Sequence, residues 1–127
     1  KKIILINDSY NSNPTSLNEA IYNFSLRKKN NQRKVLIMGD MLELGKRSKY
    51  YHQQAAKILN KTNIDKVHCI GSEVRHTYQK LNRSKKGLLV KNISFLKENI
   101  FNLLQNNDIL LVKSSNRIGL FNFFKKF

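Results

Sequence analysis

Hydrophobic and polar positions along this chain follow two patterns that alternate from one end to the other. Short apolar runs rich in branched residues favour buried strands. These predicted strands cover residues 3–6, 34–38, 67–70, 88–90 and 109–112. Between them, apolar residues recur every three or four positions, which predicts helices with one apolar face. These helices cover residues 14–28, 73–81 and 96–104, and two more begin near residues 48 and 120.

Strands and helices therefore alternate along the chain, and no hairpin signal separates two strands. Because parallel strands need a crossover between them, this order predicts an α/β fold. We expect a mostly parallel sheet of about five to six strands with helices on both faces. The chain of 127 residues suits a single domain with a real core.

Charge is the most conspicuous feature of the composition, with 24 Lys and Arg against 8 Asp and Glu and a net charge of +16. A basic surface attracts nucleic acids and anionic membranes. Here, however, the cations are spread along the chain in short pairs, without a clustered basic helix or an aromatic-rich RNA-binding motif. A compositional bias toward A-rich codons also explains abundant Lys and Asn. We expect no nucleic-acid partner, and a stand-alone basic nucleic-acid-binding module is kept as an alternative.

Two further features concern the compartment. No apolar run approaches the ~20 residues that cross a bilayer, so we expect no membrane association. The lone cysteine, Cys69, lies in an apolar run and is expected to be a buried, inert thiol in a reducing compartment. We therefore predict a cytoplasmic, monomeric protein.

The most polar stretch that follows a predicted strand is Asn7-Asp8-Ser9-Tyr10-Asn11-Ser12-Asn13-Pro14. Asn13 suits the N-cap and Pro14 the first turn of the next helix. Polar side chains at the carboxyl ends of strands are where open α/β sheets bind ligands. A polar turn that only caps the helix is the alternative.

Other candidate motifs are weaker. The segment from Gly39 to Lys46 has five residues between its glycines and Arg47 after its lysine, so it is not a Walker A loop. No G-x-G-x-x-G follows a strand, and the three histidines lack the spacing of metal ligands. We therefore assign neither catalytic residues nor metal ligands.

Three loop segments give the chain a family resemblance. Residues 8–17, Asp-Ser-Tyr-Asn-Ser-Asn-Pro-Thr-Ser-Leu, resemble the D-S-Y-N-A-N-P-x-S-(M/L) signature of a Mur ligase. Residues 38–45 resemble the L-G-D-M-L-E-L-G segment of the same enzymes, and Ser48 and His52 lie where they often have Ser and His. Residues 111–116 are similar to their (L/V)-(V/I)-K-G-S-(R/N) turn. The segments occur in family order and span almost the whole chain.

This resemblance implies the C-terminal domain of a Mur ligase, a Rossmann-like α/β unit. Such ligases use ATP and Mg²⁺ to join D-alanyl-D-alanine to a UDP-MurNAc-tripeptide in peptidoglycan synthesis. The resemblance implies that Asp8 lies near the ATP ribose. It also implies that Tyr10, Asn11 and Asn13 lie near the nucleotide or its phosphates.

The other two segments imply a substrate-facing edge of the cleft. By resemblance, its residues are Asp40, Glu43, His52, Lys113, Ser115 and Asn116. Ser114 stands where the family usually has glycine, so we do not assign the family's turn conformation to this segment. A C-terminal domain of another Mur-type or folylpolyglutamate-type ligase is a further alternative.

The family's phosphate-binding loop, magnesium carboxylate and modified lysine belong to a central domain without a counterpart in this sequence. Its UDP-binding N-terminal domain has no counterpart here either. We therefore expect residues 1–127 to be one domain, a fragment or truncated product that is inactive alone. Its partners would be those two domains, and the metal ligands would lie in the central one.

Overall fold

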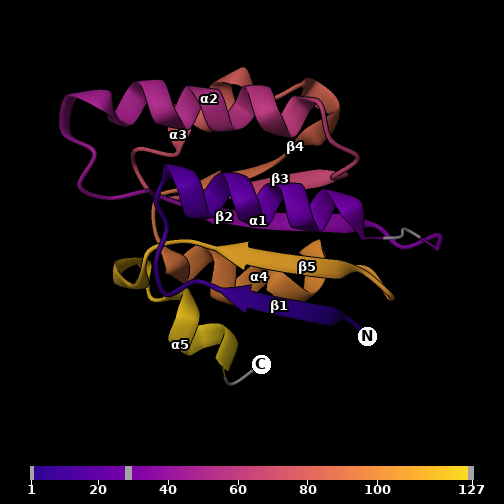
Figure 1. The fold of residues 1–127 in the computed structure, drawn as a ribbon. Coiled ribbons are helices and arrows are strands. Elements are labelled where there is room, and N and C mark those ends of the chain that lie inside the picture. Colours follow the sequence, from indigo (N-terminus) through magenta and orange to yellow (C-terminus); the bar gives the residue numbers. More distant parts are fainter. Residues whose placement is uncertain (1, 28–29, 126–127) are drawn as a thin grey trace.

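A computed structural model describes residues 2–27 and 30–125. Its described strands form one sheet in which every neighbouring pair is parallel, in the order β1-β5-β2-β3-β4 (Figure 1). The strands are β1 (Ile4–Asp8), β2 (Lys34–Gly39), β3 (Lys66–Ile70), β4 (Lys86–Val90) and β5 (Ile109–Lys113). The expected parallel α/β architecture is thereby confirmed.

Helices cover both faces of this sheet. The described α-helices are α1 (Pro14–Leu26), α2 (Ser48–Asn60), α3 (Arg75–Lys80), α4 (Ile93–Leu103) and α5 (Leu120–Lys125). Short 3-10 turns cover Gly45–Arg47, Arg83–Lys85 and Asn116–Ile118. In Figure 1, α1, α2 and α3 lie on one side of the sheet, and α4 and α5 lie on the other.

Strict alternation along the central strands produces two hydrophobic cores. On β2, Leu36 and Met38 belong to the core beneath α1, α2 and α3, whereas Val35 and Ile37 belong to the core beneath α4 and α5. Each of these side chains is fully buried. A strand covered on both faces is apolar throughout, which is why β2 is a continuous apolar run in the sequence.

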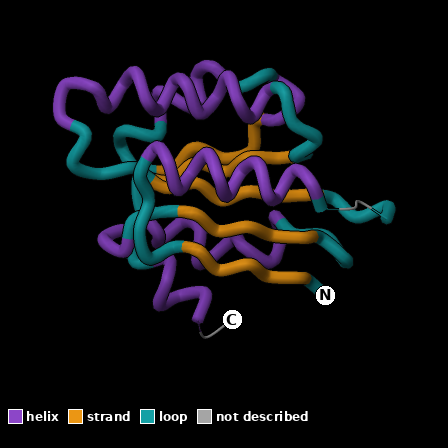
Figure 2. The backbone as a smooth tube through the Cα atoms, viewed as in Figure 1, coloured by secondary structure: helices purple, strands orange, loops and turns teal. Residues whose placement is uncertain are grey.

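The order of the strands decides where the loops separate. β1 leads into α1 on one face, whereas its neighbour β5 leads toward α5 on the opposite face. β3 and β4 repeat the arrangement, since β3 leads to α3 and β4 leads to α4. A crevice outside the carboxyl ends of the strands forms where neighbouring connections leave in opposite directions. The sheet therefore has such crevices between β1 and β5, between β5 and β2 and between β3 and β4. Figure 2 shows loops clustered at the carboxyl edge of the strands.

Boundaries differ by a few residues from the sequence-based prediction at most elements. β1 extends to Asp8 because its pairing with β5 continues through Asn7 and Val112 to Asp8 and Lys113. The predicted loop at Asn7 and Asp8 was therefore wrong. α3 is shorter than predicted. The predicted helical positions Lys28 and Phe127 lie outside the described residues.

The amino edge of the sheet is closed by an ion pair between Arg33 and Asp108. The guanidinium donates to both carboxylate oxygens, at 3.1 and 2.7 Å, and also to the Leu103 carbonyl at 2.8 Å. The Asp108 side chain is almost completely buried. The ion pair joins the start of β2 to the turn before β5. Removing one partner of a buried pair leaves the other charge unpaired in the interior, which destabilises the fold.

His68 on β3 is a buried imidazole with no assigned role in ligand binding. Its Nδ1 accepts a hydrogen bond of 2.9 Å from the Leu88 amide of β4. Burial, followed by the positive charges of Arg33 and Lys66, lowers its pKa from 6.5 to about 4, against the opposing effect of Asp108. The folded protein therefore holds a neutral imidazole at pH values where the unfolded chain binds a proton.

We predict that replacing His68 with asparagine reduces the acid sensitivity of folding. The native imidazole contributes stability that is fully present above pH 6.5 and is lost as the pH falls toward 4, by about 3 kcal/mol in total. The asparagine side chain retains an acceptor for the Leu88 amide but does not titrate. Urea unfolding at pH values from 4 to 7.5 should give a flatter curve for H68N than for the native chain.

The matched control for this experiment is His76→Asn. The pKa of His76 is also lowered by burial and by Arg75, but we expect H76N to change the slope less than H68N does. An H68N curve parallel to the native one would show that His68 does not make folding acid-sensitive.

Candidate functional site

The carboxyl ends of β1 and β5 hold a buried ammonium group. Lys113 is 2% exposed, and its Nζ donates to the Asn11 carbonyl oxygen at 2.6 Å. The same Nζ lies 3.3 Å from Oδ2 of Asp8, whose side chain is half exposed. A buried cation requires such partners, so Lys113 fixes the path of the loop that leaves β1. The exposed part of the Asp8 carboxylate remains open to a ligand.

Asp8 and Lys113 line a pocket of about 370 Å³. Tyr10 and Asn11 line it from the β1–α1 loop, so the structure brings together three of the four residues expected near a nucleotide. The remaining lining residues lie on α1: Ser16, Glu19, Ala20 and Asn23. Sequence reasoning missed this helical wall. Its signal was the recurrence of polar residues at positions 16, 19 and 23, which share a helix face.

The electrostatics of this pocket favour hydroxyl donors over phosphate. Asp8 and Glu19 contribute two carboxylates, while Lys113 contributes one ammonium that is already bonded to the loop. An anion would meet net repulsion here, whereas a carboxylate accepts readily from hydroxyl groups.

Tyr10 provides an exposed aromatic surface beside the pocket. The residue is 64% exposed, and its ring packs edge-to-face against Phe121 of α5, with centroids 5.5 Å apart. Aromatic pairs of this geometry are favourable and position the ring.

Asn13 forms the predicted N-cap of α1. Its Oδ1 accepts from the Ser16 amide at 2.9 Å, and the Ser16 hydroxyl accepts from the Asn13 amide at 3.0 Å. Asn13 lines a separate, open depression together with Leu44 and Tyr51. The side-chain oxygen and the backbone amide of Asn13 are both used in the cap, so its role in the structure is to stabilise the start of α1.

Two buried hydroxyl groups follow the same pair of strands. The Oγ atoms of Ser12 and Ser115 are buried and have no hydrogen-bond partner within the described part of the chain. Such groups are uncommon in proteins and call for an explanation such as a bound ligand or water. Asn116 begins the adjacent 3-10 turn.

Asp40 joins the end of β2 to the start of α3. It is 5% exposed, and its two carboxylate oxygens accept from the amides of Val74 and Ser72, at 2.8 and 3.1 Å. Gly71 has a φ of +130°, and a Cβ there would lie 2.4 Å from Oδ1 of Asp40. The carboxylate therefore braces the β3–α3 turn.

His52 supports the same loop from α2. It is fully buried, and its Nε2 accepts from the Met41 amide at 3.1 Å while its Nδ1 donates to the Ser48 carbonyl at 2.7 Å. The Ser48 hydroxyl donates to Glu73 at 2.6 Å, and this bond lowers the pKa of the Glu73 carboxyl. Both imidazole nitrogens are occupied, so His52 positions the loop.

Glu43 lies at the exposed tip of this loop, with a φ of 63°. The exposed carboxylate of Glu43 therefore lies on a loop that the buried side chains of Asp40 and His52 hold in place. Among the residues expected at the substrate edge, Asp40 and His52 are bracing groups, and Glu43 is on the surface.

Ser114 fits the turn after β5 without backbone strain. Positive φ among the described residues occurs at seven positions: Asn30, Asn31, Glu43, Gly45, Gly71, Asn107 and Gly119. Ser114 is not among them, so the turn does not require glycine there. Instead Gly39, at the end of β2, faces it: a Cβ on Gly39 would lie 2.4 Å from the Ser114 Cβ.

Other reactive groups in the described chain are inert or isolated. Cys69 is buried, and burial followed by the Asp40 charge raises the pKa of its thiol. The described residues contain no group of three or more His, Cys, Asp or Glu that could hold a metal ion. None of the described helices is both long and apolar enough to cross a membrane.

Comparison with known proteins connects this geometry to a family. The family model for the Mur ligase glutamate ligase domain matches residues 1–116. The chain belongs to this family. Its resemblance to Mur ligases is thus confirmed, over the three loop segments and the strands between them.

Two curated relatives with the same name show what the chain is similar to. A UDP-N-acetylmuramoyl-tripeptide–D-alanyl-D-alanine ligase of Buchnera aphidicola subsp. Acyrthosiphon pisum is 36% identical over 112 residues, which is 88% of this chain and 24% of that protein. The ligase of that name from Rickettsia prowazekii is 28% identical over 91% of this chain and 25% of its own length. This Mur ligase domain therefore spans about a quarter of the curated relatives it matches.

Solved structures share the fold. A MurF ligase of Thermotoga maritima in complex with ADP superposes with a TM-score of 0.78 at 20% identity, over 98% of this chain and 28% of that one. A MurF structure from Acinetobacter baumannii gives a TM-score of 0.81 at 22% identity, over 99% and 28%. The Rossmann-like arrangement of this Mur ligase domain is thereby confirmed.

We predict that Gly39→Ala destabilises the domain by about 1–3 kcal/mol, because the added methyl group overlaps Ser114 across the β2/β5 edge. Replacing Ser114 with glycine in the same chain removes the overlap. The double variant G39A/S114G should therefore be more stable than G39A alone in urea unfolding. Losses that simply add in the double variant would refute the contact between the two positions.

Proposed function

We propose that this chain is the C-terminal domain of an ATP-dependent ligase that adds D-alanyl-D-alanine to UDP-MurNAc-tripeptide. The observation that carries the proposal is the pocket at β1/β5. Its residues Asp8, Tyr10, Asn11 and Lys113 belong to two of the loop segments that carry the family resemblance. The names of the curated relatives support the reaction, and the ADP bound to the Thermotoga maritima structure supports the nucleotide.

The pocket fits the sugar part of ATP. The exposed part of the Asp8 carboxylate accepts from ribose hydroxyls, and the acidic Glu19 disfavours phosphate at this position. The exposed ring of Tyr10 lies at the pocket wall, where it contacts the nucleoside. We propose that the phosphates lie toward the start of α1, where the positive end of the helix dipole favours anions.

ATP supplies the phosphoryl group that activates the carboxylate of the acyl donor, and this chain's residues contribute one wall of that site. Asp8 orients the nucleoside, and Lys113 holds the loop that carries Tyr10 and Asn11. Asp40 and His52 keep the β2–α2 loop in a fixed conformation, so that Glu43 faces the substrate side.

The described residues do not fit a Mg²⁺ site, since they lack a cluster of three candidate ligands. We assign no step to the metal within this domain and propose that its ligands lie in a central domain. Several points remain predictions. They are the presence of an N-terminal UDP-binding domain and a central domain, the ADP-forming reaction, a monomeric state and the absence of a nucleic-acid partner.

We predict that Asp8→Asn weakens ATP binding about fivefold, because an uncharged amide oxygen accepts more weakly from the ribose hydroxyls. Titration calorimetry of the native and D8N chains measures this difference. 2′,3′-Dideoxy-ATP lacks both hydroxyls, so the two chains should differ much less in their affinity for it. Glu98→Gln, at an exposed α4 position, is the matched control and should leave ATP binding unchanged.

We also predict that the 127-residue chain alone releases no phosphate from ATP above the protein-free rate. The sequence has no Walker A loop, and the described residues hold no metal-binding cluster. A malachite-green assay with Mg²⁺, D-alanyl-D-alanine and ATP tests this prediction. Phosphate release that tracks the concentration of the purified chain would contradict it.

A further inference from the structure

The strand β4 lies at the end of the sheet opposite to the β1/β5 pocket. It is the last strand in the order β1-β5-β2-β3-β4, so one of its two edges has no described strand beside it. Every residue of β4 is at least partly exposed, whereas every residue of the central strand β2 is buried. The outer edge of such a strand presents backbone groups that can pair with another extended segment.

The two ends of the sheet differ in what lies beside them. At the other end, α5 lies against β1, and the side-chain amide of Asn7 donates to the Phe121 carbonyl at 3.3 Å. β4 is contacted by α3 and α4, which lie on opposite faces of the sheet. These two helices cover the faces of β4 and leave its outer edge accessible.

The hydrogen bonds of β4 show which of its backbone groups point outward. The Val90 carbonyl accepts from the Gly71 amide at 2.9 Å, so Val90 faces β3. The Leu88 amide also faces β3, because it donates to Nδ1 of His68 at 2.9 Å. Successive residues of a strand direct their backbone groups to alternate sides, so those of Leu89 point away from β3. The outer edge therefore offers a donor and an acceptor for a new strand.

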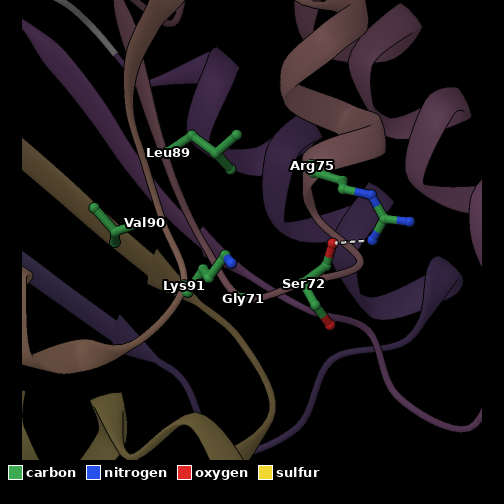
Figure 3. Close-up of a pocket in the computed structure, with 6 residues that line it drawn as sticks. All are labelled: Gly71, Ser72, Arg75, Leu89, Val90 and Lys91. Carbon is green, nitrogen blue, oxygen red and sulfur yellow. Dashed lines mark hydrogen bonds between the residues drawn. The ribbon is translucent and has the colours of Figure 1, made fainter.

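A second pocket, of about 450 Å³, lies at the carboxyl end of this edge. In Figure 3 the end of β4 and the residue after it form one wall, and the turn before α3 forms the other. The lining residues are Gly71, Ser72, Arg75, Leu89, Val90 and Lys91. None of them belongs to the three segments that carry the family resemblance. The side chain of Leu89 is the apolar part of this surface, since the residue is 41% exposed.

The sequence around β4 is cationic over a long stretch. Between Glu73 and Glu98 the chain carries seven Lys and Arg and no Asp or Glu. This stretch contains α3, β4 and most of the first half of α4. Lys86 begins β4, and Lys91 follows its last residue and is exposed. The aliphatic residues of β4 are therefore flanked by a cation at each end.

The carboxylates on the neighbouring loops do not neutralise this charge. Glu73 accepts from the Ser48 hydroxyl, and its other oxygen lies 3.7 Å from Arg75. Asp40 is almost completely buried and accepts from two backbone amides. The Arg75 side chain is about half exposed, so it remains accessible beside Lys91. The pocket therefore attracts a carboxylate from outside the domain.

We propose that the outer edge of β4 binds an extended acidic segment of a partner protein, which adds to the sheet as a further strand. The backbone of Leu89 pairs with the segment. Arg75 and Lys91 bind an acidic side chain at one end, and Lys86 binds another at the other end. An apolar side chain between them contacts Leu89 and Val90. This partner surface goes beyond the proposed ligase function and does not depend on it.

A second copy of this chain is a poorer occupant of the same edge. Two β4 strands paired antiparallel would bring the Lys86 end of each copy toward the Lys91 end of the other. Like charges that face each other across paired strands are destabilising. An acidic segment replaces this repulsion with attraction, so the same lysines that keep two copies apart select the partner.

The test is a titration of the ¹⁵N-labelled chain with the acetylated and amidated peptide Asp-Glu-Val-Leu-Val-Glu-Asp. We expect amide chemical shifts at Leu89, Val90 and Lys91, and slower hydrogen exchange at the Leu89 amide. Exchange at the Leu88 amide should change less, because that amide already donates to His68. The same peptide with N-methyl groups on its three apolar residues keeps its charge but loses those donors. It should bind about tenfold more weakly.

Charge is tested on both partners. A peptide with Asn and Gln in place of its acidic residues should bind more weakly than the acidic peptide. Arg75→Gln and Lys91→Gln should each weaken binding of the acidic peptide about twofold to fivefold, as expected for a partly exposed ion pair. Lys2→Gln is the matched control. It removes the same charge from an exposed position before β1, at the other end of the sheet, and should leave binding unchanged.

Four results would overturn the proposal. The first is the absence of shifts at Leu89, Val90 and Lys91, and the second is equal binding of the N-methylated or the uncharged peptide. The third is tighter binding of a single-stranded oligonucleotide at the same amides, which would assign the surface to nucleic acid. The fourth is protection of the Leu89 amide that grows with protein concentration in the absence of peptide, which would assign the edge to a second copy.

Discussion

The buried ammonium of Lys113 is the interaction on which the nucleotide-side geometry depends. It ends β5, yet its partners, the Asp8 carboxylate and the Asn11 carbonyl, lie on β1 and on the loop that follows it. A charge that is 2% exposed must be neutralised and hydrogen-bonded. The loop is thus held by a cation from the other end of the chain, and α1 begins where that constraint places it.

A different principle organises the middle of the sheet edge. There the loop after β2 is held by side chains that bond to backbone amides: Asp40 bonds to the amides of Ser72 and Val74, and His52 to that of Met41. Such groups resemble catalytic ones in the sequence, since a carboxylate, a serine and a histidine are all present. In the structure their hydrogen-bonding atoms are occupied within the fold, so they act as supports for neighbouring loops.

The two pockets occupy corresponding positions in the topology and differ in charge. The β1/β5 pocket combines two carboxylates with one engaged ammonium, whereas the β3/β4 pocket is lined by two cations and aliphatic side chains. Both lie where neighbouring connections leave toward opposite faces of the sheet. The two ends of one sheet edge therefore differ in the charged side chains that line them. The chain's net charge of +16 does not decide between these sites, because what matters locally is which charges are already paired.

The sequence by itself determined the parallel α/β fold, because apolar runs and helical periodicity act locally and alternate along the chain. It also determined the N-cap at Asn13, since capping involves only residues 13 and 16. The wall of α1 at Glu19 and Asn23 and the contact of Gly39 with Ser114 needed the tertiary structure. So did the supporting role of His52 and the pocket between Arg75 and Lys91. These features join residues far apart in the chain, and only the strand order β1-β5-β2-β3-β4 decides which of them become neighbours.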